Sequence, residues 1–174
     1  MQAVAERAGV TKPVVYACFP SKEELFRALL RREEGRILGE IQAAFGEADL
    51  VDPERTLSGG FTAFLRAVAA SPEVYRLIFL QEGGGNMAVA RRIQRGREAQ
   101  VDALSLLARG WLERDSRGER TAGELDATAR LLGHAIAGLA EAGARLLLSG
   151  VDQWTPESLG RELGKLGAGA QAAV

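Results

Sequence analysis

Residues 2–26 read QAVAERAGVTKPVVYACFPSKEELF, and this stretch decides how the chain begins to fold. Gln2 to Ala8 predict a short helix, and Gly9 stands where a glycine can end a helix in the left-handed conformation. Thr11 can cap a second short helix that runs to about Cys18. A helix, a tight glycine turn and a second helix form the helix-turn-helix arrangement, whose second helix enters the major groove of DNA.

Downstream of this motif, cap residues and apolar spacing predict further helices. Ser21 and Glu24 form a capping box, so a long helix is expected over about residues 21–46. Apolar residues at three- and four-residue spacing predict a helix that ends at about residue 114 and another over residues 124–149. Three further helix starts follow from Asp-Pro, Ser-Pro and Thr-Pro pairs, at Pro53, Pro72 and Pro156.

The expected fold class is all-α, because no alternating stretch of useful length predicts a strand. It consists of an N-terminal helix-turn-helix head followed by a helical bundle. We expect the Gly83-Gly84-Gly85 run to interrupt the helices, residues 115–123 to form a polar loop, and the small residues from Gly167 onward to fray.

The composition is that of a soluble globular protein. The chain has 174 residues, of which 47% are hydrophobic and 26% charged, and a net charge of −1. DNA binding would therefore need a local basic patch, and from Arg7 to Lys22 the sequence has three basic residues and no acidic one. The single cysteine, Cys18, fits a reducing cytoplasm, and the apolar runs are short for a membrane span. We expect a cytoplasmic protein without membrane contact.

Residues 5–26 resemble the DNA-binding signature of the tetracycline-repressor (TetR) family. The matching positions are Ala5, Ala8, Gly9, Val10, Thr11, Tyr16, Phe19, Ser21, Lys22 and Leu25. The resemblance implies a DNA-binding head with its connecting helix over residues 1–45, and a ligand-sensing, dimer-forming domain over residues 46–174. The family usually has tyrosine or histidine at the position of Cys18. Its head normally begins with one more helix, so we expect the head to lack this first helix.

The resemblance also implies which residues bind DNA. The expected contacts are Thr11, Lys12, Pro13, Val14, Tyr16 and Lys22. Lys12 would donate to guanine or to a phosphate, the Tyr16 hydroxyl would meet a phosphate, and Lys22 would meet the DNA backbone. Val15 and Phe19 are expected in the core. The alternative for these exposed residues is an ordinary solvated helix face.

A regulator of this family would also bind a small apolar or amphipathic effector. The candidate ligand-binding residues are Phe64, Tyr75, Phe79, Trp111, His134 and Glu141. The aromatic residues fit an ordinary core equally well. His134 stands two turns before Glu141 on the same helix face, so it predicts either a polar anchor for the ligand or a polar group at a dimer seam.

Small residues between Gly133 and Gly143 predict a close approach of neighbouring helices. In the family the last two long helices form the dimer interface, which here implies residues 124–149 and 156–167. The seam residues that this implies are Leu139, Leu146, Leu159, Leu163 and Leu166.

The function that these expectations favour is a homodimeric regulator, a repressor that binds double-stranded operator DNA and is released by its effector. An alternative is a helical ligand-binding or dimerisation module without DNA binding. A third is an enzyme that uses His134 and Glu141 as acid and base. No nucleophile motif, phosphate-binding loop or metal-ligand set accompanies this pair, so we expect no catalysis, cofactor or metal.

Overall fold

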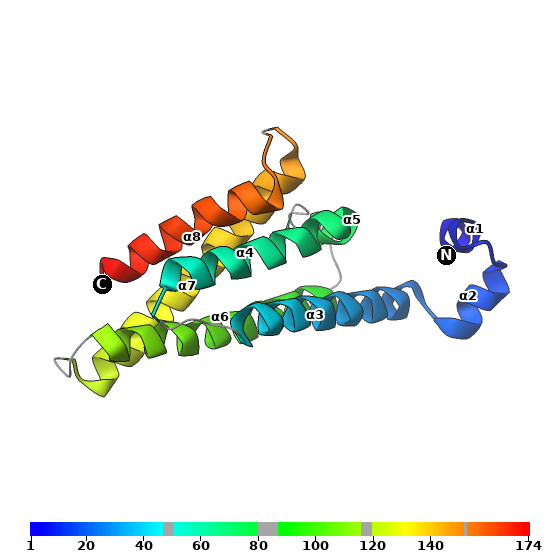
Figure 1. Cartoon of the computed structure of the whole chain (residues 1–174). Helices are drawn as coiled ribbons and strands as arrows, with labels where there is room; N and C mark the ends of the chain where they lie inside the picture. The colour runs from blue at the N-terminus through cyan, green and yellow to red at the C-terminus, as the bar shows by residue number, and fades with distance from the viewer. Residues whose placement is uncertain (47–50, 80–86, 116–119, 152) are drawn as a thin grey trace. The chain divides into compact units, whose positions relative to one another are not determined.

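The computed structural model describes residues 1–46, 51–79, 87–115, 120–151 and 153–174. The described residues form helices and no strand, as the sequence predicted (Figure 1). The helices are α1 (Gln2–Ala8), α2 (Lys12–Cys18), α3 (Lys22–Gly46), α4 (Pro53–Ala70), α5 (Pro72–Phe79), α6 (Met87–Asp115), α7 (Ala122–Ser149) and α8 (Pro156–Ala172). The chain divides into two compact units, residues 1–37 and residues 38–174, so α3 contributes to both.

The helix starts agree with the predicted cap positions. The Glu24 N–H donates to Ser21 Oγ at 3.1 Å at the start of α3. The Arg55 N–H donates to Asp52 Oδ1 at 2.9 Å at the start of α4. At α8 the Ser158 N–H donates to the Thr155 hydroxyl at 3.1 Å. Each bond satisfies a backbone donor that the first helical turn leaves without a partner, which explains why these starts were predictable.

The predicted fraying after Gly167 is wrong, because α8 continues to Ala172. Gly167 is buried, and a Cβ placed there would lie 2.9 Å from Leu57 Cδ1 of α4, so the last turns of α8 pack against another helix. The start of α6 also differs from the prediction, because this helix begins at Met87, earlier than its apolar spacing indicated. The Gly83-Gly84-Gly85 run lies outside the described residues.

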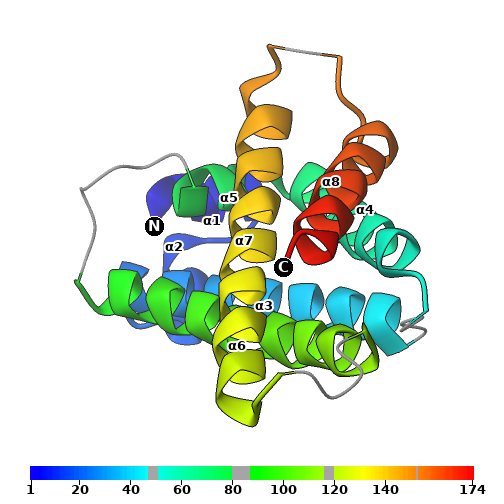
Figure 2. The same ribbon diagram turned by 90° about the vertical axis from the view of Figure 1, so that its left-hand side faces the viewer.

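In the unit of residues 38–174, α8 lies along α4 and α7 crosses α6 (Figure 2). α7 also contacts α4, α5 and α8, so it is the central helix of this unit. The core side chains of these helices include Leu57, Leu65, Val68, Ala108, Leu112, Leu132, Ile136, Ala144, Leu148, Leu159 and Leu163. α7 is long and apolar enough to cross a membrane by length and composition, but 44% of its most apolar stretch is buried inside the protein. A core helix has this composition as well.

Glycines set the spacing between α4 and α8. A Cβ at Gly160 would lie 2.8 Å from the backbone nitrogen of Thr62, and a Cβ at Gly164 would lie 2.7 Å from that of Ser58. Real Cβ atoms do not approach backbone this closely, so the two helices can keep their separation only with glycine at these positions. In the same way, a Cβ at Gly133 of α7 would lie 2.9 Å from the carbonyl oxygen of Val101, which confirms the predicted close approach at this glycine, whereas a Cβ at Gly138 would meet nothing within 4 Å.

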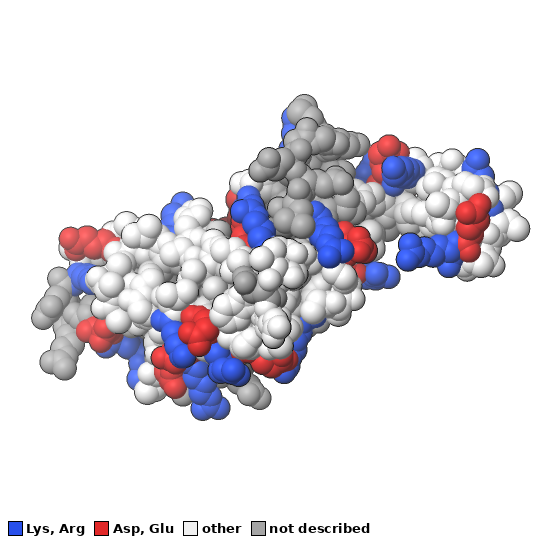
Figure 3. Space-filling model, turned by 90° about the horizontal axis from the view of Figure 1, so that it is seen from above, with Lys and Arg blue, Asp and Glu red and all other residues white. Residues whose placement is uncertain are grey.

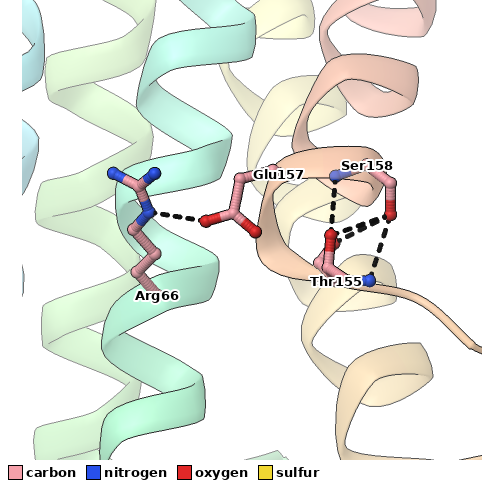
Figure 4. Close-up of polar contacts among 4 residues, drawn as sticks. All are labelled: Arg66, Thr155, Glu157 and Ser158. Atoms are coloured by element: carbon pink, nitrogen blue, oxygen red, sulfur yellow. Dashed lines mark hydrogen bonds and ion pairs between the residues drawn. The ribbon is translucent and has the colours of Figure 1, made fainter.

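A polar bridge joins the same two helices near the start of α8 (Figure 4). Arg66 Nε of α4 donates to Glu157 Oε1 at 2.8 Å. The hydrogen bond from Arg66 lowers the pKa of the Glu157 carboxyl below its ordinary value of 4.5, and a backbone hydrogen bond at the start of α8 lowers it further. The ionised carboxylate is therefore the form that the folded state favours.

We expect Glu157→Gln to destabilise the protein at neutral pH and to have less effect in acid. Because the folded-state pKa lies below the unfolded value, this carboxylate contributes stability above pH 4.5 and loses the contribution as the pH falls through the folded pKa. The measurement is urea unfolding of both proteins over this pH range. A difference in unfolding free energy that stays constant into acid would contradict the assignment.

Candidate nucleic-acid interface

The turn between α1 and α2 is built by Gly9, which ends α1 with φ of +66°. The Val10 N–H donates to the carbonyl oxygen of Ala5 at 3.0 Å and closes this turn. Ala5 and Val15 are buried, with 1% and 6% of their surface exposed, and α1 contacts α2. A left-handed conformation favours glycine because it has no Cβ, so the helix-turn-helix geometry follows directly from residues 2–18.

The residues predicted to contact DNA are all exposed on the surface of the head. They are Thr11, Lys12, Pro13, Val14, Tyr16 and Lys22. Val14 and Tyr16 keep 48% and 43% of their surface exposed, although both have large apolar parts that a fold would bury where it can. Val15 between them points inward, as the sequence predicted, while Phe19 is only partly buried. These residues of α2 therefore remain exposed to solvent and contribute little to the core of the head.

Thr11 holds the N-cap position of α2 with an extended backbone, φ −83° and ψ 153°. Its carbonyl oxygen accepts from the Val14 N–H at 3.0 Å. Thr11 is thus the N-cap residue that the sequence predicted, but its hydroxyl makes no capping bond to the helix. Pro13 explains part of the difference, since it removes one of the N–H groups that a cap would satisfy.

Lys12 lies beside Tyr16 on the exposed side of α2. Its Nζ is 5.9 Å from the centroid of the Tyr16 ring. Residues four apart on a helix are neighbours, so this contact follows from the spacing. No acidic residue occurs between Arg7 and Lys22, which makes the surface around the pair locally basic. On the face of the protein drawn in Figure 3, basic and acidic side chains occur in small mixed groups with uncharged surface between them.

Comparisons with known proteins agree on one family. Residues 1–29 match the family model described as "Bacterial regulatory proteins, tetR family". A curated relative, the HTH-type transcriptional activator FasR of Mycolicibacterium smegmatis, is 33% identical over 104 residues, which are 60% of this chain and 47% of the relative. The head of this chain is therefore similar to the DNA-binding segment of the TetR family. It spans about half the length of the curated relative that it matches.

The helices that follow the head resemble those of a solved structure. A TetR-like transcriptional regulator from Rhodococcus sp. RHA1 superposes with a TM-score of 0.75 at 21% sequence identity, over 99% of this chain and 84% of that structure. At this identity the similarity shows the fold alone. The helical body of this chain thus has a known architecture.

Two of the predicted ligand-binding residues lie together. The rings of Phe64 in α4 and Tyr75 in α5 meet edge to face, with centroids 6.2 Å apart, and both are buried. Trp111 of α6 is also buried, with 2% of its surface exposed. Among the residues that the structure describes, no acceptor lies within hydrogen-bond distance of its Nε1. The side chain of Phe79 lies outside the described part of the chain.

The other two predicted ligand-binding residues have different surroundings. His134 is exposed on α7. Glu141 Oε1 lies 2.6 Å from Arg97 Nε of α6, so its carboxylate belongs to an ion pair between helices. Sequence spacing carries no signal for that pair, because Arg97 and Glu141 meet only through the crossing of α6 and α7. No group of three His, Cys, Asp or Glu side chains within the described ranges could hold a metal ion.

The predicted dimer seam needs a correction at Leu159 and Leu163. Both are buried inside the chain, with 3% and 4% of their surface exposed. Leu163 packs against Gly143 of α7, where an added Cβ would lie 2.5 Å from Leu163 Cδ1. Leu146 and Leu166 are exposed as a seam would require, and Leu139 is partly buried. A row of small or apolar residues follows the exposed side of α7, and we call it the α7 outer row: Ala127, Leu131, Ala135, Gly138, Ala142 and Leu146.

Proposed function

We propose that this chain is the DNA-binding and ligand-sensing part of a homodimeric transcriptional regulator that reads operator DNA through α2. The exposed side of α2 carries this proposal. Its residues are Thr11, Lys12, Pro13, Val14 and Tyr16, with Lys22 at the start of α3. A helix that exposes a valine, a tyrosine and a lysine immediately after a helix-turn-helix glycine has the chemistry to meet base edges, methyl groups and phosphates.

The proposed division of labour assigns residues 1–45 to the head with its connecting helix and residues 46–174 to ligand sensing and dimerisation. α3 is continuous from Lys22 to Gly46 and belongs to both compact units, so a displacement at one of its ends would be carried to the other. An effector that prefers one head separation shifts operator affinity by its differential affinity for the two states. We infer that the effector releases the DNA.

The α7 outer row supports a homodimer. Leu131 and Leu146 expose 62% and 41% of their surface, and the residues between them on this row are alanine or glycine. Small residues allow the close approach of a second helix, and leucines supply apolar area. The exposure of His134 beside this row favours its role at the seam over a role in the ligand site. Two heads held this way would read half-sites about 34–36 Å apart, one turn of DNA.

The aromatic residues of the body support a small apolar or amphipathic effector. Phe64 and Tyr75 are buried together, and the Nε1 of Trp111 is a buried donor for which no protein partner occurs among the described residues. A buried donor without a partner costs about 1–3 kcal/mol. An effector that presents an oxygen acceptor to Trp111 would recover this energy, and we propose such an effector. His134 is exposed and Glu141 pairs with Arg97, so we assign neither residue to this site.

The sign of regulation is a separate part of the proposal. We expect a repressor in the cytoplasm, without membrane contact, although FasR is named an activator. A reporter gene behind the protein's own promoter distinguishes the two, because deletion of a repressor raises expression and deletion of an activator lowers it. The competing function is a helical module that binds ligand and dimerises but does not bind DNA. It predicts a folded dimer with no affinity for DNA at low salt.

The test of DNA binding is the affinity of the full chain for fragments of its own promoter region, measured against salt concentration. We expect Lys12→Ala to lower the affinity roughly tenfold and to reduce the salt slope by about one, because one phosphate or base contact is lost. Arg114→Ala, which removes one exposed positive charge from the end of α6, is the matched control and should change neither quantity. Equal behaviour of both variants would refute the interface.

A further inference from the structure

Lys12 and Tyr16 of the proposed interface contact each other in the free protein. Lys12 Nζ lies 5.9 Å from the centroid of the Tyr16 ring, within the range in which a ring face attracts an ammonium group. Both residues are exposed, and they stand one helical turn apart on α2. The contact therefore exists at the surface where DNA would bind.

Nothing else in the described residues holds the Lys12 ammonium in place. None of the ion pairs among the described residues includes Lys12, and the sequence from Arg7 to Lys22 has no acidic residue. Lys12 is the first residue of α2, and the positive end of a helix dipole disfavours a cation there. The ring of Tyr16 is thus the attractive partner that the Lys12 ammonium has among the described residues.

We propose that the ring of Tyr16 positions Lys12 for contact with operator DNA, a role separate from any hydrogen bond that the Tyr16 hydroxyl makes. A free lysine side chain has many rotamers, and ordering it on binding lowers affinity. The ring restricts these rotamers before DNA arrives. Tyr16 is a positioning residue in this respect, because it acts through Lys12. This inference rests on the proposed function, since it assumes that Lys12 meets DNA.

Two substitutions separate the ring from the hydroxyl. Tyr16→Phe removes the hydroxyl and keeps the ring, whereas Tyr16→Leu removes both and keeps an apolar side chain that suits a helix. If the ring positions Lys12, Tyr16→Leu should bind promoter DNA about two- to fivefold more weakly than Tyr16→Phe, the range expected for an exposed cation–ring contact. If only the hydroxyl matters, the two variants should bind equally.

A double-mutant cycle assigns the extra loss to Lys12. In a Lys12→Ala background the difference between the Tyr16→Phe and Tyr16→Leu variants should vanish, because no ammonium remains to be positioned. A difference that persists in this background would mean that leucine disturbs α2 itself, and it would overturn the proposal. Proton NMR of the full chain adds a readout without DNA. The Lys12 side-chain protons should show an upfield ring shift in the unsubstituted chain and in Tyr16→Phe, and they should lose it in Tyr16→Leu.

The outcomes keep the inference and the proposed function apart. If the unsubstituted chain has no affinity for DNA at low salt, the proposed function fails, and the DNA role of the Lys12–Tyr16 pair fails with it. If the unsubstituted chain binds and the Tyr16→Phe and Tyr16→Leu variants bind equally, the proposed function stands and only the positioning role is overturned. Absence of the ring shift in the unsubstituted chain would also overturn the positioning role.

Discussion

Gly164→Ala is expected to lower the free energy of unfolding of the 38–174 unit by about 1–3 kcal/mol, the usual cost of forcing extra volume into a packed interface. The new methyl group would lie 2.7 Å from the backbone nitrogen of Ser58, and backbone cannot rotate away as a side chain can. The helix would have to move off α4 and lose contacts along its length. Urea or thermal unfolding measures the change.

Gly169→Ala is the control for this substitution, because Gly169 lies on the same helix with nothing within 4 Å of an added Cβ. Alanine favours a helix over glycine by about 1 kcal/mol, so this variant should be as stable as the original protein or slightly more stable. Opposite changes in unfolding free energy in the two variants would show why position 164 needs glycine. The reason would be the short distance between α4 and α8 and not helix propensity. Equal stabilisation in both variants would contradict the close approach.

Leu131→Lys is expected to shift the protein from dimer to monomer, with a dimer dissociation constant at least about tenfold higher. A charge buried without a partner at the seam costs several kcal/mol, which exceeds the roughly 1.4 kcal/mol of a tenfold change. Sedimentation velocity over a range of concentrations measures the dissociation. Operator affinity should fall in parallel, because a monomer engages only one half-site.

Leu106→Lys is the matched control, since Leu106 is an exposed leucine of α6 outside the α7 outer row. Leu106 keeps 73% of its surface exposed, so lysine should be accommodated there without a change in oligomeric state. A Leu131→Lys protein that remains dimeric at the lowest concentration measured would rule out this row as the seam.

Local features of the fold were predictable from the sequence, and long-range ones were not. The starts of α4 and α8 depend on Asp52 and Thr155, whose hydrogen bonds reach only three residues along the chain. The end of α8 depends instead on Leu57 and Phe61 of α4, so composition alone wrongly predicted fraying there. The pairing of distant helices has no signal in a single sequence.

The same distinction explains the seam. α8 has leucines on more than one side, and spacing could not tell that Leu163 packs inward while Leu166 remains exposed. Glycines of α7 present the same ambiguity, since Gly133 is required by contact with α6 whereas Gly138 has open space around it. Within α2, by contrast, the buried Val15 and its exposed neighbours follow from the helix-turn-helix pattern, because both helices of that motif are adjacent in sequence.

The packing of α8 along α4 also affects how the protein emerges from the ribosome. Ser58 and Thr62 are synthesised roughly 100 residues before their partners Gly164 and Gly160, which at about 5–20 residues per second means a delay of about 5–20 s. During this delay the apolar side of α4, with Leu57 and Phe61, has no α8 to cover it. Nascent chains that end before Pro156 therefore expose apolar surface of the kind that promotes aggregation.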